Sequence, residues 1–337
     1  MIATRKTKHN HGFPISGCVL PLPLLSLFAL PASMILHGAT ASPTAIPTKF
    51  LGMDVHGDPV LLPLVGAGTW QYNDTIAYQS VCKAFHAGYT FVDTALGYGN
   101  QRGVGKAIQD CWEGERSDLF VMTKIPGGLN ASQVRAAHKQ NLLELGLDYV
   151  DHLMTHFPSD WDEKVASPEA RRDEWLALEE IYKSGEARSI GISHYCTQHI
   201  LDIMWVAKVT PAINQVEYHV GSQDVDQVMD TCSDLGITFM SFSPLCGPCK
   251  YEAEDSLING DLVAEIATHY EGKTGSQISL RYIVQQGIPV IPKSNTMEHI
   301  KSNFDIFDFE LSEEHMQRLS RATKPAAESG DCSVAIA

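Results

Sequence analysis

Short apolar runs alternate with amphipathic stretches along most of this chain, and this alternation limits the fold more than any other feature. Eight runs rich in β-branched and aromatic residues are each followed by a stretch with helical spacing of its apolar residues. In the clearest stretch, Trp175, Leu178 and Ile181 share one helical face and Gly185 supplies a stop signal. Such alternation predicts parallel strands joined by helical crossovers. The runs are residues 64–66, 90–93, 119–124, 150–155, 189–192, 212–214, 237–242 and 290–291.

Eight strand-and-helix units predict an α/β protein of the (β/α)₈ TIM-barrel type, since that fold usually takes roughly 250 residues. We expect one barrel domain over residues 50–325. Before the first unit, turn residues at 54–58 separate two apolar runs and predict a β-hairpin cap. A doubly wound sheet is disfavoured because Gly66-Ala-Gly68 lacks the third glycine and the helix signal of a dinucleotide-binding turn.

The first 41 residues differ in composition from the rest, because they contain no Asp or Glu. A basic head, an apolar middle and small residues before a cut are the order of a signal or transit peptide, which predicts cleavage after Ala41. Secretory entry, organelle import and a misassigned start codon, which would leave a cytoplasmic protein, all stay open. Prolines interrupt the apolar stretch, so we expect no stable membrane anchor after processing. A linker over 42–49 and a tail over 326–337 complete the predicted organisation.

Charge and cysteine content exclude other classes. The chain has 25 Lys plus Arg against 40 Asp plus Glu, a formal charge of −15, and no basic stripe, so nucleic acid is not an expected partner. Eight cysteines are sparse for this length, and we expect the body to need no disulfides. Cys246-Gly-Pro-Cys249 has the spacing of a thioredoxin-type redox pair. A reversible disulfide there and an inert pair of thiols remain alternatives.

Four polar residues follow successive predicted strands. Asp93 ends the second strand, Lys124 the third and His156 the fourth, about one unit apart, and Tyr98 follows Asp93 closely. In a barrel these strand ends meet at one mouth. We expect the ammonium to lower the pKa of Tyr98 so that the phenol donates a proton, with Asp93 holding Lys124 in place. His156 would bind a substrate oxygen, which suits carbonyl reduction.

Each of these residues also has a purely structural interpretation. Asp93 and Lys124 can form an ion pair at the barrel rim without catalysing anything, and such pairs also perturb pKa values. Tyr98 can pack within a loop, and His156 can be a hydrogen-bonded rim residue. The occurrence of all four on neighbouring strand ends favours a shared site.

Seven motifs give the chain a specific resemblance, which extends from Phe50 to about Leu319. Their order resembles that of the aldo-keto reductase family. The motifs are Gly88-Tyr-Thr-Phe-Val-Asp-Thr-Ala-Leu-Gly-Tyr-Gly-Asn100, Phe120-Val-Met-Thr-Lys124, Leu153-Met-Thr-His-Phe-Pro158, Gly191-Ile-Ser-His-Tyr195, Asn214-Gln-Val-Glu217, Ser241-Phe-Ser-Pro-Leu245 and Ile291-Pro-Lys-Ser294.

The resemblance implies NAD(P)H-dependent reduction of aldehydes or ketones, with no metal. It implies Tyr98 as general acid, tuned by Lys124 and Asp93, and His156 as donor to the substrate oxygen. Trp70, His156 and Phe157 would contact substrate. Residues implied to bind the cofactor are Thr69, Ser193, His194, Gln215, Phe242, Ser243, Pro244, Leu245, Lys293, Ser294, Asn295, His299 and Asn303.

Four positions depart from the pattern that the resemblance implies. His194 stands where the family often has Asn, Phe242 where Tyr is usual, and Phe157 where Trp is common. His299 replaces an Arg that usually binds the 2′-phosphate of the cofactor. Because neutral His lacks the permanent charge of Arg, we expect NADPH as cofactor with NADH possible.

A second class of function uses the same fold. A nicotinamide-binding regulatory module, similar to the potassium-channel β subunits, would bind cofactor with little turnover. Fold alone does not separate these classes. The intact set of four polar residues favours a monomeric enzyme acting on a small carbonyl compound, whose identity the sequence does not give.

Overall fold

The computed structural model describes residues 46–160, 167–222, 224–246, 257–258 and 260–325. The chain separates into the units Met1–Thr44 and Ala45–Ala337, and every described residue belongs to the second unit. The expected leader over 1–41 and tail over 326–337 lie outside the described residues.

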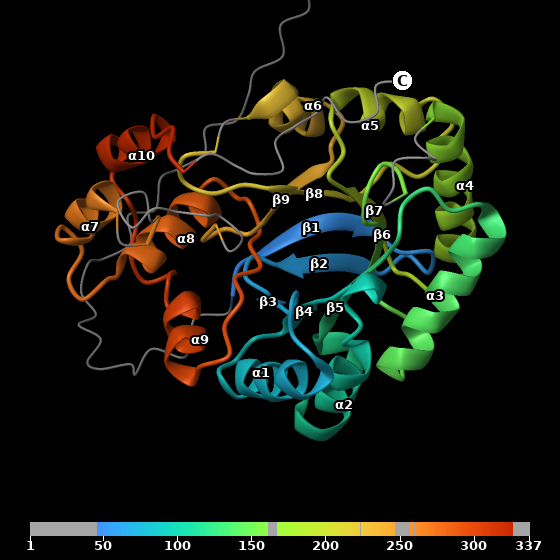
Figure 1. Ribbon diagram of the computed structural model, residues 1–337, viewed down its shortest axis with the longest axis horizontal. Coiled ribbons are helices and arrows are strands. Elements are labelled where there is room, and N and C mark those ends of the chain that lie inside the picture. The colour runs from blue at the N-terminus through green and yellow to red at the C-terminus, as the bar shows by residue number, and fades with distance from the viewer. Residues whose placement is uncertain (1–45, 161–166, 223, 247–256, 259, 326–337) are drawn as a thin grey trace, which may run out of the picture. The chain divides into compact units, whose positions relative to one another are not determined.

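A parallel sheet with strand order β3-β4-β5-β6-β7-β8-β9 forms the centre of this unit, and helices surround it (Figure 1). Val290 bridges Val65 at one edge and Ser241 at the other, which closes the ring. The predicted TIM barrel is confirmed, although its eighth strand, expected at 290–291, is reduced to this bridging residue. The strands are β3 (Ala67–Gly68), β4 (Phe91–Asp93), β5 (Phe120–Ile125), β6 (His152–Thr155), β7 (Ile190–Ser193), β8 (Ile213–Glu217) and β9 (Thr238–Phe242).

Capping residues set where the helices begin and end. Ser167 caps α4 by accepting from the Ala170 amide, and Gly185 ends that helix at φ 82°, as the sequence predicts. No described helix is both long and apolar enough to cross a membrane. The helices are α1 (Asp74–His86), α2 (Gln101–Cys111), α3 (Ala131–Leu145), α4 (Pro168–Ser184), α5 (Thr197–Met204), α6 (Val228–Asp234), α7 (Asp261–Ala267), α8 (Gly275–Gln285), α9 (Met297–Phe304) and α10 (Glu313–Ser320).

The predicted hairpin forms from β1 (Thr48–Met53) and β2 (Pro59–Pro63), which pair antiparallel. Asp54 Oδ1 accepts from the amides of His56 and Asp58 and so fixes the turn. β1 begins at Thr48, inside the stretch 42–49 expected as a linker.

The hairpin closes the amino-terminal end of the barrel. Val60 and Leu62 are fully buried and join an apolar cluster with inward-facing strand residues such as Phe91 and Met122. Burying a side chain of this size contributes roughly 1.5–3 kcal/mol. Arg188 adds polar links, because its guanidinium bonds Asp54 on the hairpin at 3.0 Å. The hairpin is therefore part of the barrel's core.

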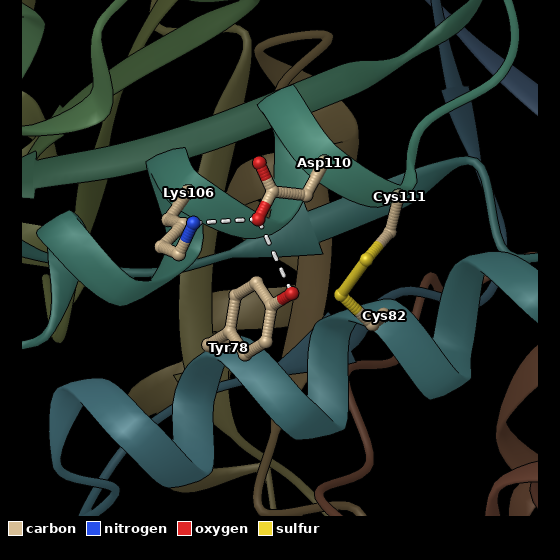
Figure 2. The surroundings of a disulfide bond; sticks show 5 residues. All are labelled: Tyr78, Cys82, Lys106, Asp110 and Cys111. Carbon is tan, nitrogen blue, oxygen red and sulfur yellow. Dashed lines mark hydrogen bonds and ion pairs between the residues drawn. A yellow bond between two sulfur atoms is a disulfide. The ribbon is translucent and has the colours of Figure 1, made fainter.

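A disulfide joins Cys82 of α1 to Cys111 of α2, beside the surface ion pair of Lys106 with Asp110 (Figure 2). The cysteine content predicted a body that needs no disulfides, and the structure nevertheless contains this one. The two cysteines are 29 residues apart, and only the packing of α1 against α2 brings them face to face. Cys196 and Cys246 each take part in a disulfide bond as well. Cys249 lies outside the described residues, so the redox pair expected at 246 and 249 stays a prediction.

Candidate active site

The four polar residues singled out at strand ends lie together at the carboxyl-terminal mouth of the barrel. Asp93 is the last residue of β4, Lys124 lies near the end of β5, and His156 directly follows β6. Tyr98 ends a single 3₁₀ turn, Leu96–Tyr98, between β4 and α2. Parallel neighbouring strands place these side chains at one edge of the ring.

A buried ion pair forms the base of the site. Lys124 Nζ lies 2.7 Å from both carboxylate oxygens of Asp93 and 3.1 Å from the Thr94 carbonyl oxygen. Tyr98 Oη is 3.4 Å from the same ammonium. The Lys124 side chain is inaccessible to solvent. Burial lowers the pKa of Lys124, and Asp93 opposes that shift.

Tyr98 does not have the lowered pKa that we expected from the neighbouring ammonium. Burial raises the pKa of Tyr98 well above its ordinary value, and the negative charge of Asp93 raises it further. The cost of burying a phenolate is the larger cause of this rise, and it outweighs the stabilisation that the neighbouring ammonium offers. Tyr98 is therefore a neutral phenol, which retains its proton near neutral pH.

His156 faces Tyr98 across the mouth, with ring centroids 5.5 Å apart. Its ring also stacks on Phe157 at 4.6 Å. Burial, and then the charge of Lys124, lower the pKa of His156 to about 2. The imidazole is therefore neutral and keeps one N–H donor and one acceptor.

These residues open on a cavity of about 380 Å³. Its wall is largely apolar and aromatic with a few polar groups, which is the usual composition of a small-molecule site. Of the residues implied by the family resemblance, it contains Thr69, Trp70, Asp93, Tyr98, His156, Phe157, His194, Gln215, Phe242, Ser243, Pro244, Leu245 and Lys293.

Two further predicted residues lie behind this wall. Lys124 is covered by Asp93 and Tyr98, and Ser193 is fully buried with its hydroxyl donating to the Gln215 carbonyl oxygen at 2.9 Å. His194 Nδ1 lies 3.0 Å from the His156 carbonyl oxygen. Gln215 Nε2 donates to Asp93 Oδ2 at 3.0 Å. Hydrogen bonds thus join the predicted nicotinamide-binding residues to the ion pair.

The residues predicted for the adenosine end of the cofactor are more scattered. Lys293 is exposed and donates to Gln71 Oε1 at 2.8 Å, while Ser294 and Asn303 line a separate small hollow beside α1. Asn295 and His299 are exposed near the start of α9. This end carries fewer interlocking contacts than the barrel mouth.

Sequence reasoning missed several groups at the site. Glu217, Ile291 and Pro292 line the cavity, although all three fall within the motifs that carry the resemblance. Gln71, with φ 64°, was missed because nothing nearby in sequence signals its contact with Lys293. Lys83 of α1, likewise missed, donates to the Asn295 carbonyl oxygen at 2.7 Å.

One group of metal-binding residue types lies near the cavity. Ligand atoms of Glu217, His219 and Cys246 fall within 4.8 Å of one another. Cys246 is disulfide-bonded, whereas metal binding requires a thiolate. The trio therefore gives no support for a metal centre.

A closed (β/α)₈ barrel with a polar cluster and an apolar cavity at its carboxyl-terminal mouth defines a barrel enzyme. A model of the aldo/keto reductase family matches residues 64–324, and the chain belongs to that family. It is accordingly an oxidoreductase of a family that acts on small molecules and uses nicotinamide cofactors.

Individual relatives agree with this assignment. An aldo-keto reductase of Mycolicibacterium vanbaalenii is 36% identical over 281 residues, which covers 82% of this chain and 92% of that protein. A D-galacturonate reductase of Fragaria ananassa is 31% identical over 282 residues, covering 78% and 88% of the two chains. The crystal structure of an aldo/keto reductase from Brucella melitensis superposes with a TM-score of 0.73 at 32% identity, covering 83% and 99%.

Proposed function

We propose that the chain reduces an aldehyde or ketone to an alcohol with Tyr98 as the general acid. The observation that carries this proposal is the contact of Tyr98 Oη with Lys124 Nζ at 3.4 Å, beside His156 and at the wall of the cavity. A phenol held between an ammonium and an open apolar cavity can protonate an oxygen bound in that cavity.

The high pKa of Tyr98 is compatible with this role. A carbonyl oxygen becomes an alkoxide as its carbon is reduced, and an alkoxide is a stronger base than a phenolate. Tyr98 therefore gives its proton to the oxygen while Lys124, held by Asp93, stabilises the phenolate that remains. Neutral His156 donates its N–H to the same oxygen and orients it.

We propose NADPH as the cofactor, with NADH as an alternative. A nicotinamide cofactor supplies the hydride in this family. Phe242 offers a ring face in the cavity wall, and His194 and Gln215 offer polar atoms for a carboxamide. Ser243, Pro244 and Leu245 belong to the same wall, and the family resemblance implies that a pyrophosphate lies along them. Lys293 and Ser294 offer contacts for a 2′-phosphate, but exposed His299 lacks the charge of an Arg.

The direct test measures consumption of reduced cofactor by the chain from Ser42 with a panel of aldehydes, sugars and uronates, using NADPH and NADH in turn. The uronates are included because one relative is named a D-galacturonate reductase. We expect turnover that collapses in Tyr98→Phe. Cofactor binding without turnover on any compound would support the regulatory module instead, and activity indifferent to Tyr98 would overturn the assignment.

We also propose that the enzyme acts as a monomer. Within the described residues the strands of the barrel ring leave no open edge for pairing with a second copy, which removes one route to association. Sedimentation of the purified chain tests this, and a dimer at micromolar concentration would contradict it.

We propose further that residues 1–41 direct the chain to an oxidising compartment through the secretory pathway. The Cys82–Cys111 disulfide supports this, because disulfides rarely persist where thiols are kept reduced. The experiment translates the full chain with and without endoplasmic-reticulum microsomes. A shortened, protease-protected product containing the disulfide is expected. An unprotected full-length product would contradict secretory entry, and import by isolated mitochondria or plastids would identify a transit peptide instead.

A further inference from the structure

We propose that His194 is a positioning residue that presents only a hydrogen-bond acceptor, its Nε2 atom, to the cavity. The carboxamide of a bound nicotinamide must then turn its NH₂ group toward His194. This inference rests on the cofactor assignment made above and concerns a position where this chain has His in place of a frequent Asn.

The contacts of Nδ1 fix which ring nitrogen carries the proton. His194 Nδ1 lies 3.0 Å from the His156 carbonyl oxygen, which can only accept a hydrogen bond. It also lies 2.9 Å from Ser193 Oγ. Ser193 donates its single proton to the Gln215 carbonyl oxygen at 2.9 Å. Nδ1 therefore carries the hydrogen, since otherwise two acceptors would face each other.

The ring is neutral and held in place, so Nε2 keeps its lone pair. Burial lowers the pKa of His194 to about 4, which outweighs the opposing hydrogen bond to the His156 backbone. Phe157 and Phe242 both pack against the imidazole, with ring centroids 4.4 and 4.7 Å away. A flipped ring would lose the carbonyl contact. Within the described residues Nε2 has no hydrogen-bond partner of its own.

Gln215 presents an acceptor by the same reasoning. Its Nε2 donates to Asp93 Oδ2 at 3.0 Å, and a carboxylate paired with Lys124 accepts only. The amide oxygen Oε1 of Gln215 therefore faces away from Asp93. Both His194 and Gln215 line the cavity. The side chains at this end thus offer two acceptors, which matches the two N–H donors of a carboxamide NH₂ group.

The backbone at this position provides a matched variant. His194 has φ 62°, in the left-handed region, where Asn and His are the side chains most easily accommodated. His194→Asn therefore keeps the backbone and introduces an amide, which offers both a donor and an acceptor. It can satisfy a carboxamide in either orientation.

The first experiment compares dissociation constants of NADP⁺ and of its 3-acetylpyridine analogue, in which a methyl ketone replaces the carboxamide. The analogue keeps the oxygen and lacks the NH₂ group. Titration calorimetry should show the analogue binding the natural chain about tenfold more weakly than NADP⁺, because the acceptors lose their donors. In His194→Asn the ratio should fall to about twofold or threefold.

The matched control is His299→Asn, the same substitution at the adenosine end. It should change the affinity for both dinucleotides equally and leave their ratio intact. Equal affinity of the natural chain for the two dinucleotides, or an unchanged ratio in His194→Asn, would overturn the proposal.

A second readout needs no cofactor and separates this inference from the proposed function. Nitrogen-15 NMR of the imidazoles should show His194 protonated at Nδ1 and unprotonated at Nε2 near pH 7. The opposite tautomer would overturn the inference even if the enzyme reduces aldehydes. Failure of both dinucleotides to bind would remove the cofactor assignment and with it the role of His194, whatever the tautomer.

Discussion

The two ends of the barrel each contain a buried carboxylate paired with a cation, and only one of them is a candidate for chemistry. At the mouth, Asp93 holds Lys124. At the amino-terminal end, Asp151 holds Arg116 at 2.8 Å and Arg188 at 3.2 Å and also accepts from the Val121 amide. A second hollow, of about 610 Å³, lies beside this cluster at the amino-terminal end of the barrel, which we call the lower end.

The two ends differ in the further groups that their cations contact. Arg188 uses its other nitrogens on Asp54 and on the Pro59 carbonyl oxygen, so its donors fasten the hairpin. Lys124 instead reaches a phenol that faces an aromatic cavity. An ion pair with a hollow beside it is therefore weak evidence for a site, and a proton donor coupled to the pair is stronger evidence.

Removing the phenol tests the comparison most severely. In Tyr98→Phe we expect kcat to fall by about 10²- to 10⁴-fold, the usual contribution of a general acid. The free energy of unfolding should change by less than about 1 kcal/mol, because the ring stays in place. Steady-state kinetics and urea unfolding measure the two quantities. A stability loss that accounts for the lost activity would make Tyr98 a packing residue.

Removing the cation at the mouth should affect both stability and activity. Lys124→Met leaves the Asp93 carboxylate buried without its ammonium, which we expect to lower the free energy of unfolding by about 3–5 kcal/mol. Activity should also fall in the protein that remains folded. The double variant Lys124→Met with Asp93→Asn removes the buried charge as well, so it should recover stability but not turnover. Turnover in that double variant would contradict a role for the pair in catalysis.

The corresponding change at the lower end should affect stability alone. Arg188→Ala removes three polar contacts, but Asp151 keeps Arg116, so we expect a loss of about 1–3 kcal/mol. kcat/KM should stay within about twofold of the natural value. A large fall in kcat with little unfolding would place function at the hairpin end and break the comparison.

Both ends of the barrel contain a buried histidine that should make stability fall in acid. Burial lowers the pKa of His152, at the start of β6, to about 3, and that of His156 to about 2. The unfolded chain protonates both near pH 6.5, so stability is full above that pH and is lost as pH falls toward the folded values. Each should contribute a slope of about 1.4 kcal/mol per pH unit.

His152→Gln and His156→Gln should each remove one such slope from unfolding curves measured between pH 6 and pH 4. Only His156→Gln should lower turnover. Equal losses of turnover in the two variants would remove the distinction between the mouth and the lower end.

The sequence predicts the parts of this site that depend on strand register and misses those that depend on packing between distant segments. Asp93, Lys124 and His156 are recognisable because each ends a strand, and parallel strands bring their ends together. Cys82 and Cys111 are not recognisable, since their pairing depends on how α1 turns against α2. The predicted direction of the Tyr98 pKa shift was wrong for a similar reason, because spacing does not reveal how deeply the phenol is buried.

The hairpin limits how far the chain can be shortened from its amino terminus. The Leu64 amide donates to the Pro47 carbonyl oxygen, and β1 starts one residue later. The predicted cleavage after Ala41 would leave this contact and the hairpin whole, whereas a chain shortened past Thr48 would lose the first residue of β1 and its pairing with Pro63. Any leader that is removed before Pro47 would therefore leave the hairpin intact, so the barrel itself sets this boundary.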